Sequence, residues 1–414
     1  MNATSTTETL HSIAPAVTGE ALINIAREYG SPVYVYHAET IKKQYEKLKN
    51  AFSDTPAVFF YACKALTNIN ILRYLKSVGS NIDCSSVNEV QLALYAGFAP
   101  QNILYTSNNI AFEEIEHAAS LGVHINIDSL SNLKKFAQKF GHTYPVGIRL
   151  RPNIMAGGNL KISTGHQDSK FGIAIEQLDD VLLIMNEHNL KISGLHIHTG
   201  SEIQDFSVFM TGLELLYKLS NHFPDLRFLD LGGGFKVPYK EGEKGTDVEA
   251  LGERIAAAHR EFENSSGRKL ELWFEPGKYL VSECGYLVCQ VNVIKQTSVK
   301  EFVGVNTGLN HLIRPMFYDA WHRIENLSNP SGARKPYTVV GNICETDTFA
   351  TDRMLAEVNE GDFLVFYNAG AYGYEMASNY NARFKPAEVL IENGQSKLIR
   401  QRDTLDDLLR NQVV

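Results

Sequence analysis

Residues 228–234 read FLDLGGG, a short apolar run that ends in three consecutive glycines. An apolar run closed by turn residues is typical of a strand buried on both faces of a parallel sheet. Eight such runs occur between about residue 58 and residue 275. They are Val58–Cys63, Asn81–Cys84, Ile103–Tyr105, His124–Ile127, Val146–Leu150, Ile192–Ile197, Phe228–Leu231 and Leu272–Phe274. We therefore expect eight parallel strands in this part of the chain.

The segments between these runs have apolar residues three and four positions apart, which is typical of amphipathic helices. Examples are Ile69–Val78, Asn88–Ala96, Phe112–Leu121, Leu178–Glu187 and Val248–Glu263. Each predicted strand except the last is followed by such a segment, and this alternation indicates a parallel sheet. Eight units favour an α/β fold with a closed (β/α)8 TIM-type barrel. A doubly wound open sheet is the alternative, although it more often has about five or six strands.

The pattern changes after Gly277, where turns instead of helices separate the predicted strands. These strands are Tyr286–Ile294, Tyr337–Val340 and Phe363–Phe366. The N-terminal segment PVYVY, residues 32–36, could add a strand to the same unit. We predict a barrel over residues 37–277 and a second, mostly β domain formed by residues 1–36 and 278–414.

Composition limits the classes of function. The net charge of −8 argues against a nucleic-acid-binding protein, because phosphate backbones need clustered lysine and arginine. No apolar run approaches the roughly 18–20 residues of a membrane span, and no basic stretch followed by an apolar run marks a signal peptide. The five cysteines are an odd number without a C-x-x-C pair, so we expect reduced thiols in a cytoplasmic protein, with neither a disulfide framework nor a zinc site.

The carboxyl ends of the predicted strands carry polar residues, and barrel enzymes place their active sites at these ends. The residues are Lys64, Asp83, Arg149, His198, Gly232–Gly234 and Glu275. Each alone has an ordinary explanation, such as a solvated lysine, a structural histidine, a tight turn or a loop cap. Their common position on one predicted rim favours a functional site.

This set matches the requirements of pyridoxal phosphate. A lysine amine can form a Schiff base with an aldehyde cofactor, and consecutive glycine N–H groups can cradle a phosphate. A carboxylate can hold a pyridine nitrogen protonated, and an imidazole can stack on the ring. The glycine run lacks the G-x-G-x-x-G spacing of a dinucleotide fold.

Four motifs then resemble those of the fold type III pyridoxal-phosphate decarboxylases, which share the alanine racemase-like architecture. They are FYACKALTN (60–68), GLHIHTGSEI (194–203), LDLGGGF (229–235) and EPGKYL (275–280). Within that group the chain is similar to the diaminopimelate decarboxylases from about residue 20 to residue 400. The most specific matches are ISTGHQDSKFGI (162–173), HLIRPMFYDAWH (311–322), GNICETD (341–347) and NAGAYGYEMASNYNARFKPAEVL (368–390).

The resemblance implies a role for each matching position. Lys64 would hold the cofactor covalently, His198 would stack on its ring near Ser201, and Glu275 would pair with the ring nitrogen. The phosphate would lie on the glycine turn with help from Tyr372. The full implied cofactor set is Lys64, Asp83, Arg149, His198, Ser201, Gly232, Gly233, Gly234, Glu275, Pro276, Gly277, Lys278 and Tyr372. The implied substrate set is Lys278, Arg314, Tyr318, Glu345 and Tyr372.

The implied reaction is the decarboxylation of meso-2,6-diaminopimelate to L-lysine, the last step of lysine biosynthesis. Cys344 would donate the proton that replaces the lost carboxyl group. Cys344 and Glu345 would come from a neighbouring subunit, so the resemblance implies a homodimer with shared active sites. Arg314 suits the distal carboxylate of the substrate because its planar fork can bind both oxygens, and Glu345 suits the distal ammonium.

Two departures from the family keep other substrates open. Lys278 stands where the family usually has arginine, and the CETDT sequence departs from the usual CESGD after its first two residues. The alternative is a sister decarboxylase that acts on ornithine, arginine or a carboxylated polyamine. A racemase would need a second base, and a non-catalytic homologue would not need this residue set.

A metal-dependent barrel hydrolase is also conceivable, because His196 and His198 form an H-x-H pair on one strand face. The sequence shows no third ligand beside this pair, so we expect no metal. The segment Pro152 to Lys170 contains glycines and is a candidate lid over the substrate.

Overall fold

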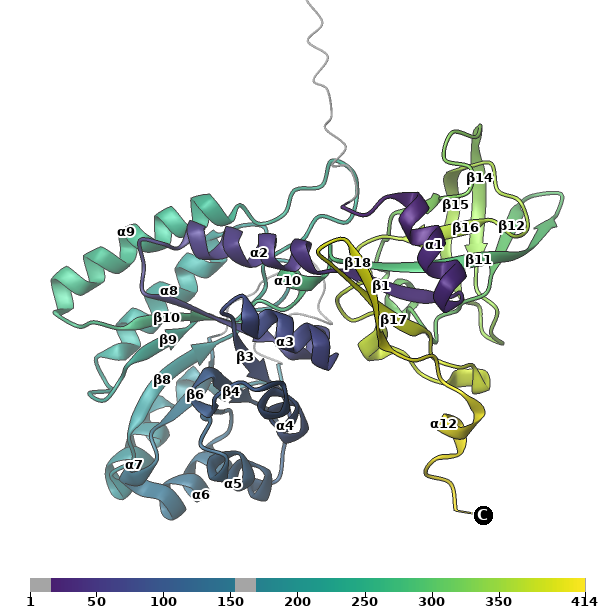
Figure 1. Cartoon of the computed structure of the whole chain (residues 1–414). Helices are drawn as coiled ribbons and strands as arrows, with labels where there is room; N and C mark the ends of the chain where they lie inside the picture. Colours follow the sequence, from purple (N-terminus) through teal and green to yellow (C-terminus); the bar gives the residue numbers. More distant parts are fainter. Residues whose placement is uncertain (1–15, 153–168, 414) are drawn as a thin grey trace, which may run out of the picture.

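Eight parallel strands close into a barrel in the computed structural model, which describes residues 16–152 and 169–413 (Figure 1). The strands are β2 (Ala57–Ala62), β3 (Asn81–Cys84), β4 (Ile103–Thr106), β5 (His124–Ile127), β6 (Val146–Arg151), β8 (Ile192–Ile197), β9 (Phe228–Asp230) and β10 (Glu271–Phe274). Neighbours in the sequence are neighbours in the sheet, and pairing of β5 with β6 and of β10 with β2 closes it. The barrel prediction is confirmed, with strand ends within one residue, and the open sheet is excluded.

The interior of the barrel is apolar at one end and polar at the other. Phe228 and Trp273 stack inside it with ring centroids 3.5 Å apart. Side chains two residues apart on a strand point the same way, so Asp230 and Glu275 follow these two rings towards the carboxyl ends of the strands. The strand register therefore places a packed aromatic floor beneath a layer of ionisable groups.

Helices surround the barrel (Figure 1). Seven follow strands: α3 (Ile69–Ser77), α4 (Val87–Ala96), α5 (Phe112–Ser120), α6 (Leu130–Phe140), α7 (Leu178–His188), α8 (Ser207–Ser220) and α9 (Val248–Ser266). The position after β10 is covered by α2 (Ala38–Ala51), which precedes the barrel in the sequence and packs against α9 and α3. The approach of α2 to α9 requires Gly252, since a Cβ there would lie 1.9 Å from the Ala51 carbonyl oxygen.

A second, mixed sheet forms the β domain. Its order is β15-β14-β12-β11-β1-β17-β18, with β16 paired to β11 and β13 paired to β16. The bounds are β1 (Val33–His37), β11 (Gly285–Gln296), β12 (Glu301–Val305), β13 (Ile324–Asn326), β14 (Arg334–Val340), β15 (Thr348–Ala356), β16 (Phe363–Phe366), β17 (Ala387–Glu392) and β18 (Gln395–Arg400). The N-terminal strand lies inside this sheet, between β11 and β17, as predicted.

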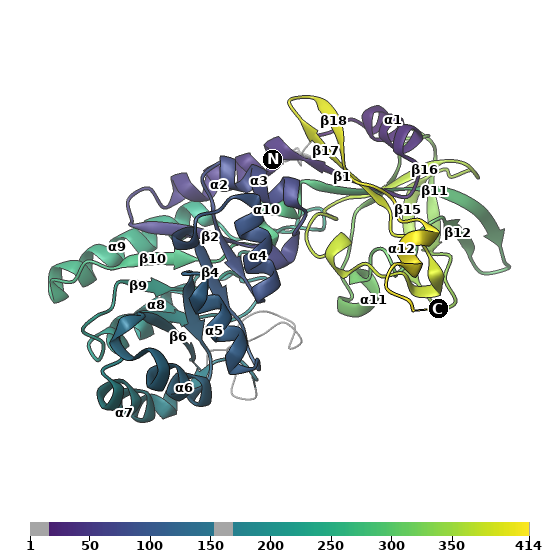
Figure 2. The ribbon, with the colours of Figure 1, turned by 60° about the horizontal axis from the view of Figure 1, so that its bottom comes forward.

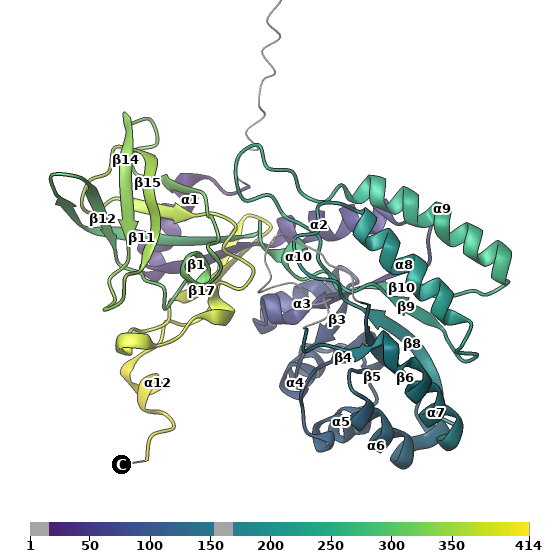
Figure 3. The same cartoon turned by 180° about the vertical axis from the view of Figure 1, so that it is seen from behind.

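The barrel and the β domain lie side by side, and the one-turn helix α10 (Lys278–Val281) lies near their junction (Figure 2, Figure 3). The remaining elements include α1 (Gly19–Tyr29), α11 (Arg314–Tyr318), α12 (Leu405–Leu409) and the two-residue strand β7 (Ile173–Ala174). We propose domain boundaries near residues 37 and 277, because β1 ends and α10 begins there. In the parts of the chain that the structure describes, no helix has the length and apolarity needed to cross a bilayer.

Candidate active site

Lys64 lies immediately after β2, in a single 3-10 turn over Cys63–Ala65. The residue is exposed, yet the surrounding barrel wall still desolvates its amine. Desolvation lowers its pKa, but the interactions with Tyr372, Asp83 and Glu275 outweigh this effect and raise the pKa overall. Asp83 and Glu275 are themselves buried, at 2% and 7% exposed. The structure thus brings the predicted lysine and two predicted carboxyl groups together at the carboxyl ends of the strands.

The turn Gly232–Gly234 requires glycine at each position. Gly232 and Gly234 have positive φ angles of 68° and 105°, and a Cβ on Gly233 would lie 2.4 Å from the Glu275 carbonyl oxygen. The Gly233 N–H donates to His198 Nδ1 at 3.2 Å, and the Glu275 N–H donates to the Gly232 carbonyl at 2.9 Å. The turn therefore fixes the positions of the histidine and the carboxylate that flank it.

His198 is half-buried at the end of β8. Burial lowers its pKa well below the ordinary value, and the charges of Arg149 and Lys64 lower it further. Because Nδ1 accepts a hydrogen bond, the neutral ring carries its proton on Nε2. A neutral, flat ring beside a glycine turn can stack on an aromatic cofactor.

Three buried side chains, His196, Asp230 and Glu275, form a cluster beneath the rim with ligand atoms within 4.8 Å of one another. His196 Nε2 lies 3.5 Å from Glu275 Oε1. The expectation that no further metal ligand lies beside the histidine pair was therefore wrong for His196, because the parallel pairing of β8 with β9 and of β9 with β10 brings Asp230 and Glu275 beside it. Burial raises the pKa of both carboxyl groups and lowers the pKa of His196, which the charge of Arg149 lowers further. The positive charge of the nearby Arg149 disfavours a metal cation at this cluster.

The residues present fit pyridoxal phosphate. Glu275 Oε1 is buried and has no hydrogen-bond partner among the described residues, so it can accept a hydrogen bond from a ring N–H. A side chain at any position of the glycine turn would clash with neighbouring atoms, so the turn exposes its backbone to a ligand. Lys64 offers an amine on the same rim. An amine, a neutral ring, a glycine cradle and an available carboxyl oxygen are the four features that the cofactor requires.

The buried Asp230 carboxyl makes the unfolding free energy of the protein depend on pH, and this dependence tests its placement. Burial raises its pKa to about 7, whereas an unfolded aspartate titrates near 4. Between these values the folded state holds a proton that the unfolded chain has released, so this group lowers stability as pH rises from about 4 to about 7. In Asp230→Asn this contribution is absent. Denaturant titration of the two cofactor-free proteins would measure the unfolding free energy of the variant minus that of wild type. We expect this difference to grow as pH rises through that window and to stay constant above it. A pH-independent difference would contradict the assignment.

The β domain contributes Tyr372 to the rim. Its backbone adopts a positive φ of 56°, which is unusual for a tyrosine, and its N–H donates to the Ala65 carbonyl at 2.9 Å. Such strain persists only where the surroundings hold it and is frequent at functional sites. The bond ties the AGAYG motif directly to the turn that carries Lys64.

Arg314, at the start of α11, is a buried cation at 5% exposed, and its Nε has no hydrogen-bond partner among the described residues. Its Cζ lies 5.4 Å from the centroid of the Tyr239 ring, and Lys278 Nζ lies 5.8 Å from the same centroid. The Tyr239 hydroxyl lies 3.1 Å from Ser282 Oγ. Tyr239 is a site residue that sequence reasoning missed, and its only signal was its position in the loop that follows the glycine turn.

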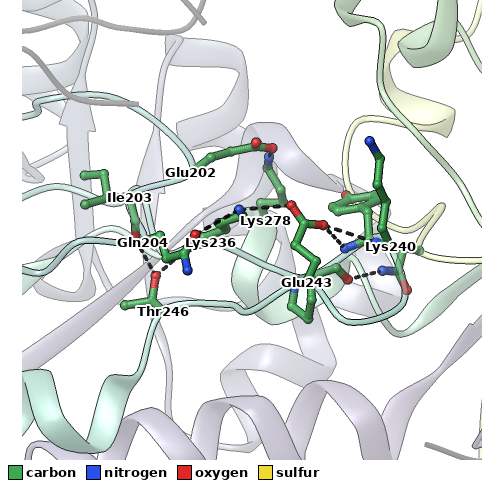
Figure 4. Close-up of polar contacts among 11 residues, drawn as sticks. Glu202, Ile203, Gln204, Lys236, Lys240, Glu243, Thr246 and Lys278 are labelled. Atoms are coloured by element: carbon green, nitrogen blue, oxygen red, sulfur yellow. Dashed lines mark hydrogen bonds and ion pairs between the residues drawn. The ribbon is translucent and has the colours of Figure 1, made fainter. Parts of the chain in front are cut away.

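Lys278 forms an ion pair with Glu202, with Nζ and Oε1 2.5 Å apart (Figure 4). Beside this pair, Lys236 pairs with Glu243 at 2.9 Å, and Glu243 accepts the backbone N–H of Tyr239 at 2.8 Å. These contacts fold the loop between β9 and α9 onto itself. Glu202 belongs to the quoted GLHIHTGSEI motif, but sequence reasoning assigned it no role.

The remaining predicted residues fall in three places. Ser201 is half-buried in the loop after β8, and Pro276 and Gly277 pack onto the end of β2, where the Pro276 carbonyl accepts the Ala62 N–H. Tyr318 ends α11. Of the candidate lid and of the ISTGHQDSKFGI motif, residues 153–168 lie outside the described residues.

Cys344 and Glu345 are exposed in the loop between β14 and β15. The Cys344 N–H donates to Asn381 Oδ1 at 2.8 Å, and the Tyr380 hydroxyl donates to Glu345 Oε1 at 2.8 Å. Both contacts come from the β domain, and neither joins these residues to the barrel rim of the same chain.

Residues 38–282 match the family model "Pyridoxal-dependent decarboxylase, pyridoxal binding domain". The chain is 38% identical to the diaminopimelate decarboxylase of Methanothermobacter thermautotrophicus over 410 residues, which is 96% of this chain and 95% of that protein. It is 34% identical to the Escherichia coli K12 enzyme over 97% of this chain and 98% of that one. The Helicobacter pylori diaminopimelate decarboxylase crystallised with L-lysine superimposes with a TM-score of 0.87 at 33% identity, covering 94% of this chain and 98% of that one.

These matches span both the barrel and the β domain, and they confirm the predicted family and cofactor. The chain belongs to the diaminopimelate decarboxylase family of pyridoxal-dependent decarboxylases.

Proposed function

We propose that the protein removes carbon dioxide from meso-2,6-diaminopimelate to give L-lysine. The observation that supports this substrate most directly is Arg314, a buried guanidinium without a hydrogen-bond partner at Nε among the described residues. A buried cation needs an anion, and diaminopimelate carries a second carboxylate that a simple diamine precursor lacks. The Arg314 fork suits both oxygens of that carboxylate.

Bound pyridoxal phosphate would supply an electron-withdrawing ring that stabilises the charge left on the substrate carbon when carbon dioxide departs. In this proposal Lys64 attaches the cofactor and Glu275 accepts the ring N–H. His198 packs on the ring face. Gly232–Gly234, with Ser201 and Tyr372, bind the phosphate. Asp83, Arg149, Pro276, Gly277 and Lys278 complete the cofactor pocket, and Lys278, Arg314, Tyr318 and Tyr372 face the substrate.

The test is to follow lysine and carbon dioxide from meso-diaminopimelate with the purified enzyme loaded with pyridoxal phosphate. Release of both products in equal amounts is expected. A loaded enzyme that leaves diaminopimelate unchanged but decarboxylates ornithine, arginine or a carboxylated polyamine would instead support the sister decarboxylase. Inversion of configuration without carbon dioxide release would indicate a racemase.

We propose a homodimer in which Cys344 and Glu345 of one subunit enter the site of the other. Their exposure and their position on the β domain support this arrangement, since an exposed loop is free to meet a second chain. The Cys344 thiol would then donate a proton to the substrate carbon that has lost its carboxyl group. A thiol with this role must stay reduced, which favours action in the cytoplasm.

Cys344→Ala is expected to reduce kcat by about 10²- to 10⁴-fold, the range of a lost general acid, with little change in cofactor binding. Steady-state kinetics and titration with pyridoxal phosphate would measure the two effects. Cys289→Ala is the matched control, because Cys289 is buried in the β domain. Loss of the cofactor from Cys344→Ala would mean that the thiol is structural.

Mixing two inactive variants tests the shared site. In a homodimer that exchanges subunits, Lys64→Ala combined with Cys344→Ala should restore about one quarter of wild-type activity, because half of the dimers are mixed and each mixed dimer has one intact site. Failure to recover activity after confirmed subunit exchange would contradict the sharing of sites between subunits.

A further inference from the structure

The Glu375 carboxylate of the β domain holds the backbone just after Lys64 with both of its oxygens. Its Oε1 accepts the Thr67 N–H at 2.8 Å, and its Oε2 accepts the Thr67 hydroxyl at 2.6 Å. Thr67 lies three residues after Lys64, beyond the single 3-10 turn over Cys63–Ala65. Two charge-assisted hydrogen bonds to one residue fix the direction of the backbone as well as its position.

The segment that carries Glu375 also carries Tyr372, which the proposed function places at the phosphate and the substrate. The Tyr372 N–H donates to the Ala65 carbonyl at 2.9 Å. A Cβ on Gly373 would lie 2.4 Å from a backbone carbonyl oxygen, so the segment requires glycine there and is closely packed. A short, packed segment of the β domain therefore contacts the backbone on the C-terminal side of Lys64 at two residues.

A second carboxylate anchors the next residue, Asn68, to the β domain. Asn68 caps the N-terminus of α3 and donates its Nδ2 to Glu388 Oε2 at 2.9 Å. Glu388 is fully buried and also bonds to a tyrosine hydroxyl and to Arg400, so a substitution there would disturb the interior of the β domain. Glu375 is half-buried and directs both of its oxygens at Thr67. Of the two carboxylates, Glu375 is therefore the one that can be changed with less effect on the core.

We propose that Glu375 is a positioning residue for the cofactor lysine, and that its two bonds to Thr67 set the direction in which the Lys64 amine points. This inference rests on the proposed attachment of pyridoxal phosphate to Lys64, and it adds a residue that lies outside the cofactor pocket. Glu375 acts by keeping the backbone after Lys64 in one position. Without it, the turn must be ordered when the cofactor binds, and the entropy lost in that step weakens binding.

Titration of the full-length, cofactor-free protein with pyridoxal phosphate measures this effect without turnover. Glu375→Ala removes both bonds, and we expect the Kd of the cofactor, followed by the visible absorbance of its bound form, to rise about ten- to hundredfold. Glu375→Gln should stay within about threefold of wild type, because its amide oxygen can accept the Thr67 N–H and its amide nitrogen can donate to the Thr67 hydroxyl oxygen. Rescue by glutamine would show that the hydrogen bonds, and not the negative charge, are responsible.

A second variant tests the same contact from the barrel side. Thr67→Val removes the hydroxyl and keeps the backbone N–H, so the Kd of the cofactor should rise about tenfold. Combined with Glu375→Ala it should add nothing, because the bond that it breaks is already absent. Glu360→Ala is the matched control, since Glu360 Oε1 also accepts a backbone N–H, that of Ile294 at 3.0 Å, but lies between β15 and β16. Its Kd should equal that of wild type.

Melting temperatures, measured on the same variants, separate positioning from a purely structural role. If Glu375→Ala melts at a lower temperature but binds the cofactor with the wild-type Kd, the carboxylate only supports the fold and the inference is overturned. Binding by Glu375→Gln as weak as that of Glu375→Ala would also overturn it. If Glu375→Ala gives no folded protein, Thr67→Val decides, and a wild-type Kd of that variant would overturn the inference. Lys64→Ala that keeps the wild-type absorbance would instead overturn the proposed attachment at Lys64, together with the inference built on it.

Discussion

Replacing Lys64 by alanine is expected to remove both the covalent attachment of pyridoxal phosphate and the decarboxylase activity. Lys64 is the amine that follows β2 on the rim, where it interacts with Asp83 and Glu275. Without this amine the aldehyde has no partner on the rim. We expect kcat/KM to fall by at least about 10³-fold, as for removal of a nucleophile. The visible absorbance of protein-bound cofactor should be lost in parallel.

Two comparisons make this result specific. Lys42→Ala removes an exposed lysine of α2 that pairs with Glu46 at 3.7 Å, and it should behave as wild type because such surface pairs contribute little. A small primary amine added to Lys64→Ala should restore part of the turnover. Substantial activity of Lys64→Ala without added amine would show that Lys64 does not hold the cofactor.

Arg314→Ala is expected to raise KM for diaminopimelate by at least about 30-fold, in line with the roughly 2–5 kcal/mol lost when a buried charge pair loses one partner. Arg314 is buried and lies against the Tyr239 ring, and no carboxylate of the described residues forms an ion pair with it. Its charge is therefore available for an anionic substrate. Steady-state kinetics with diaminopimelate and with a one-carboxylate amino acid would measure the effect.

The test compares the change in KM for these two substrates. KM for the one-carboxylate substrate should change far less, because it has no distal anion to lose. Arg314→Lys keeps the charge but loses the planar fork, so it should fall between wild type and the alanine variant. An equal rise in KM for both substrates would mean that Arg314 supports the fold of the site and does not bind the distal carboxylate.

The local sequence pattern was sufficient for the barrel and for much of its rim. Strand positions were predictable because apolar runs and turn residues are properties of a few adjacent residues. Lys64, His198, Gly232–Gly234 and Glu275 were found because the residue after each strand of a parallel barrel lies on one rim. The roles of Arg314 and Cys344 came from motif resemblance, since nothing in their local spacing points to a site.

Other features depended on contacts between residues far apart in the sequence. The helix that covers the strand pair β10–β2 is α2, which comes before the barrel, and only packing against α9 shows this position. His196 and Asp230 lie on β8 and β9 and Glu275 follows β10, so their cluster exists only because these three strands pair side by side. Sequence reasoning considered His196 as one of a histidine pair and could not see the two carboxyl groups beside it.

The sequence by itself determined the barrel, the rim on which cofactor chemistry is expected and the family. Only the tertiary structure decided how the charges of the substrate group are arranged. Glu202 meets Lys278, and both Lys278 and Arg314 lie against the Tyr239 ring, because three loops and the β domain converge at one place. The physical reason is one of range: hydrophobic period and turn chemistry act over a few residues, whereas an ion pair or a ring contact depends on the distance in space that folding sets.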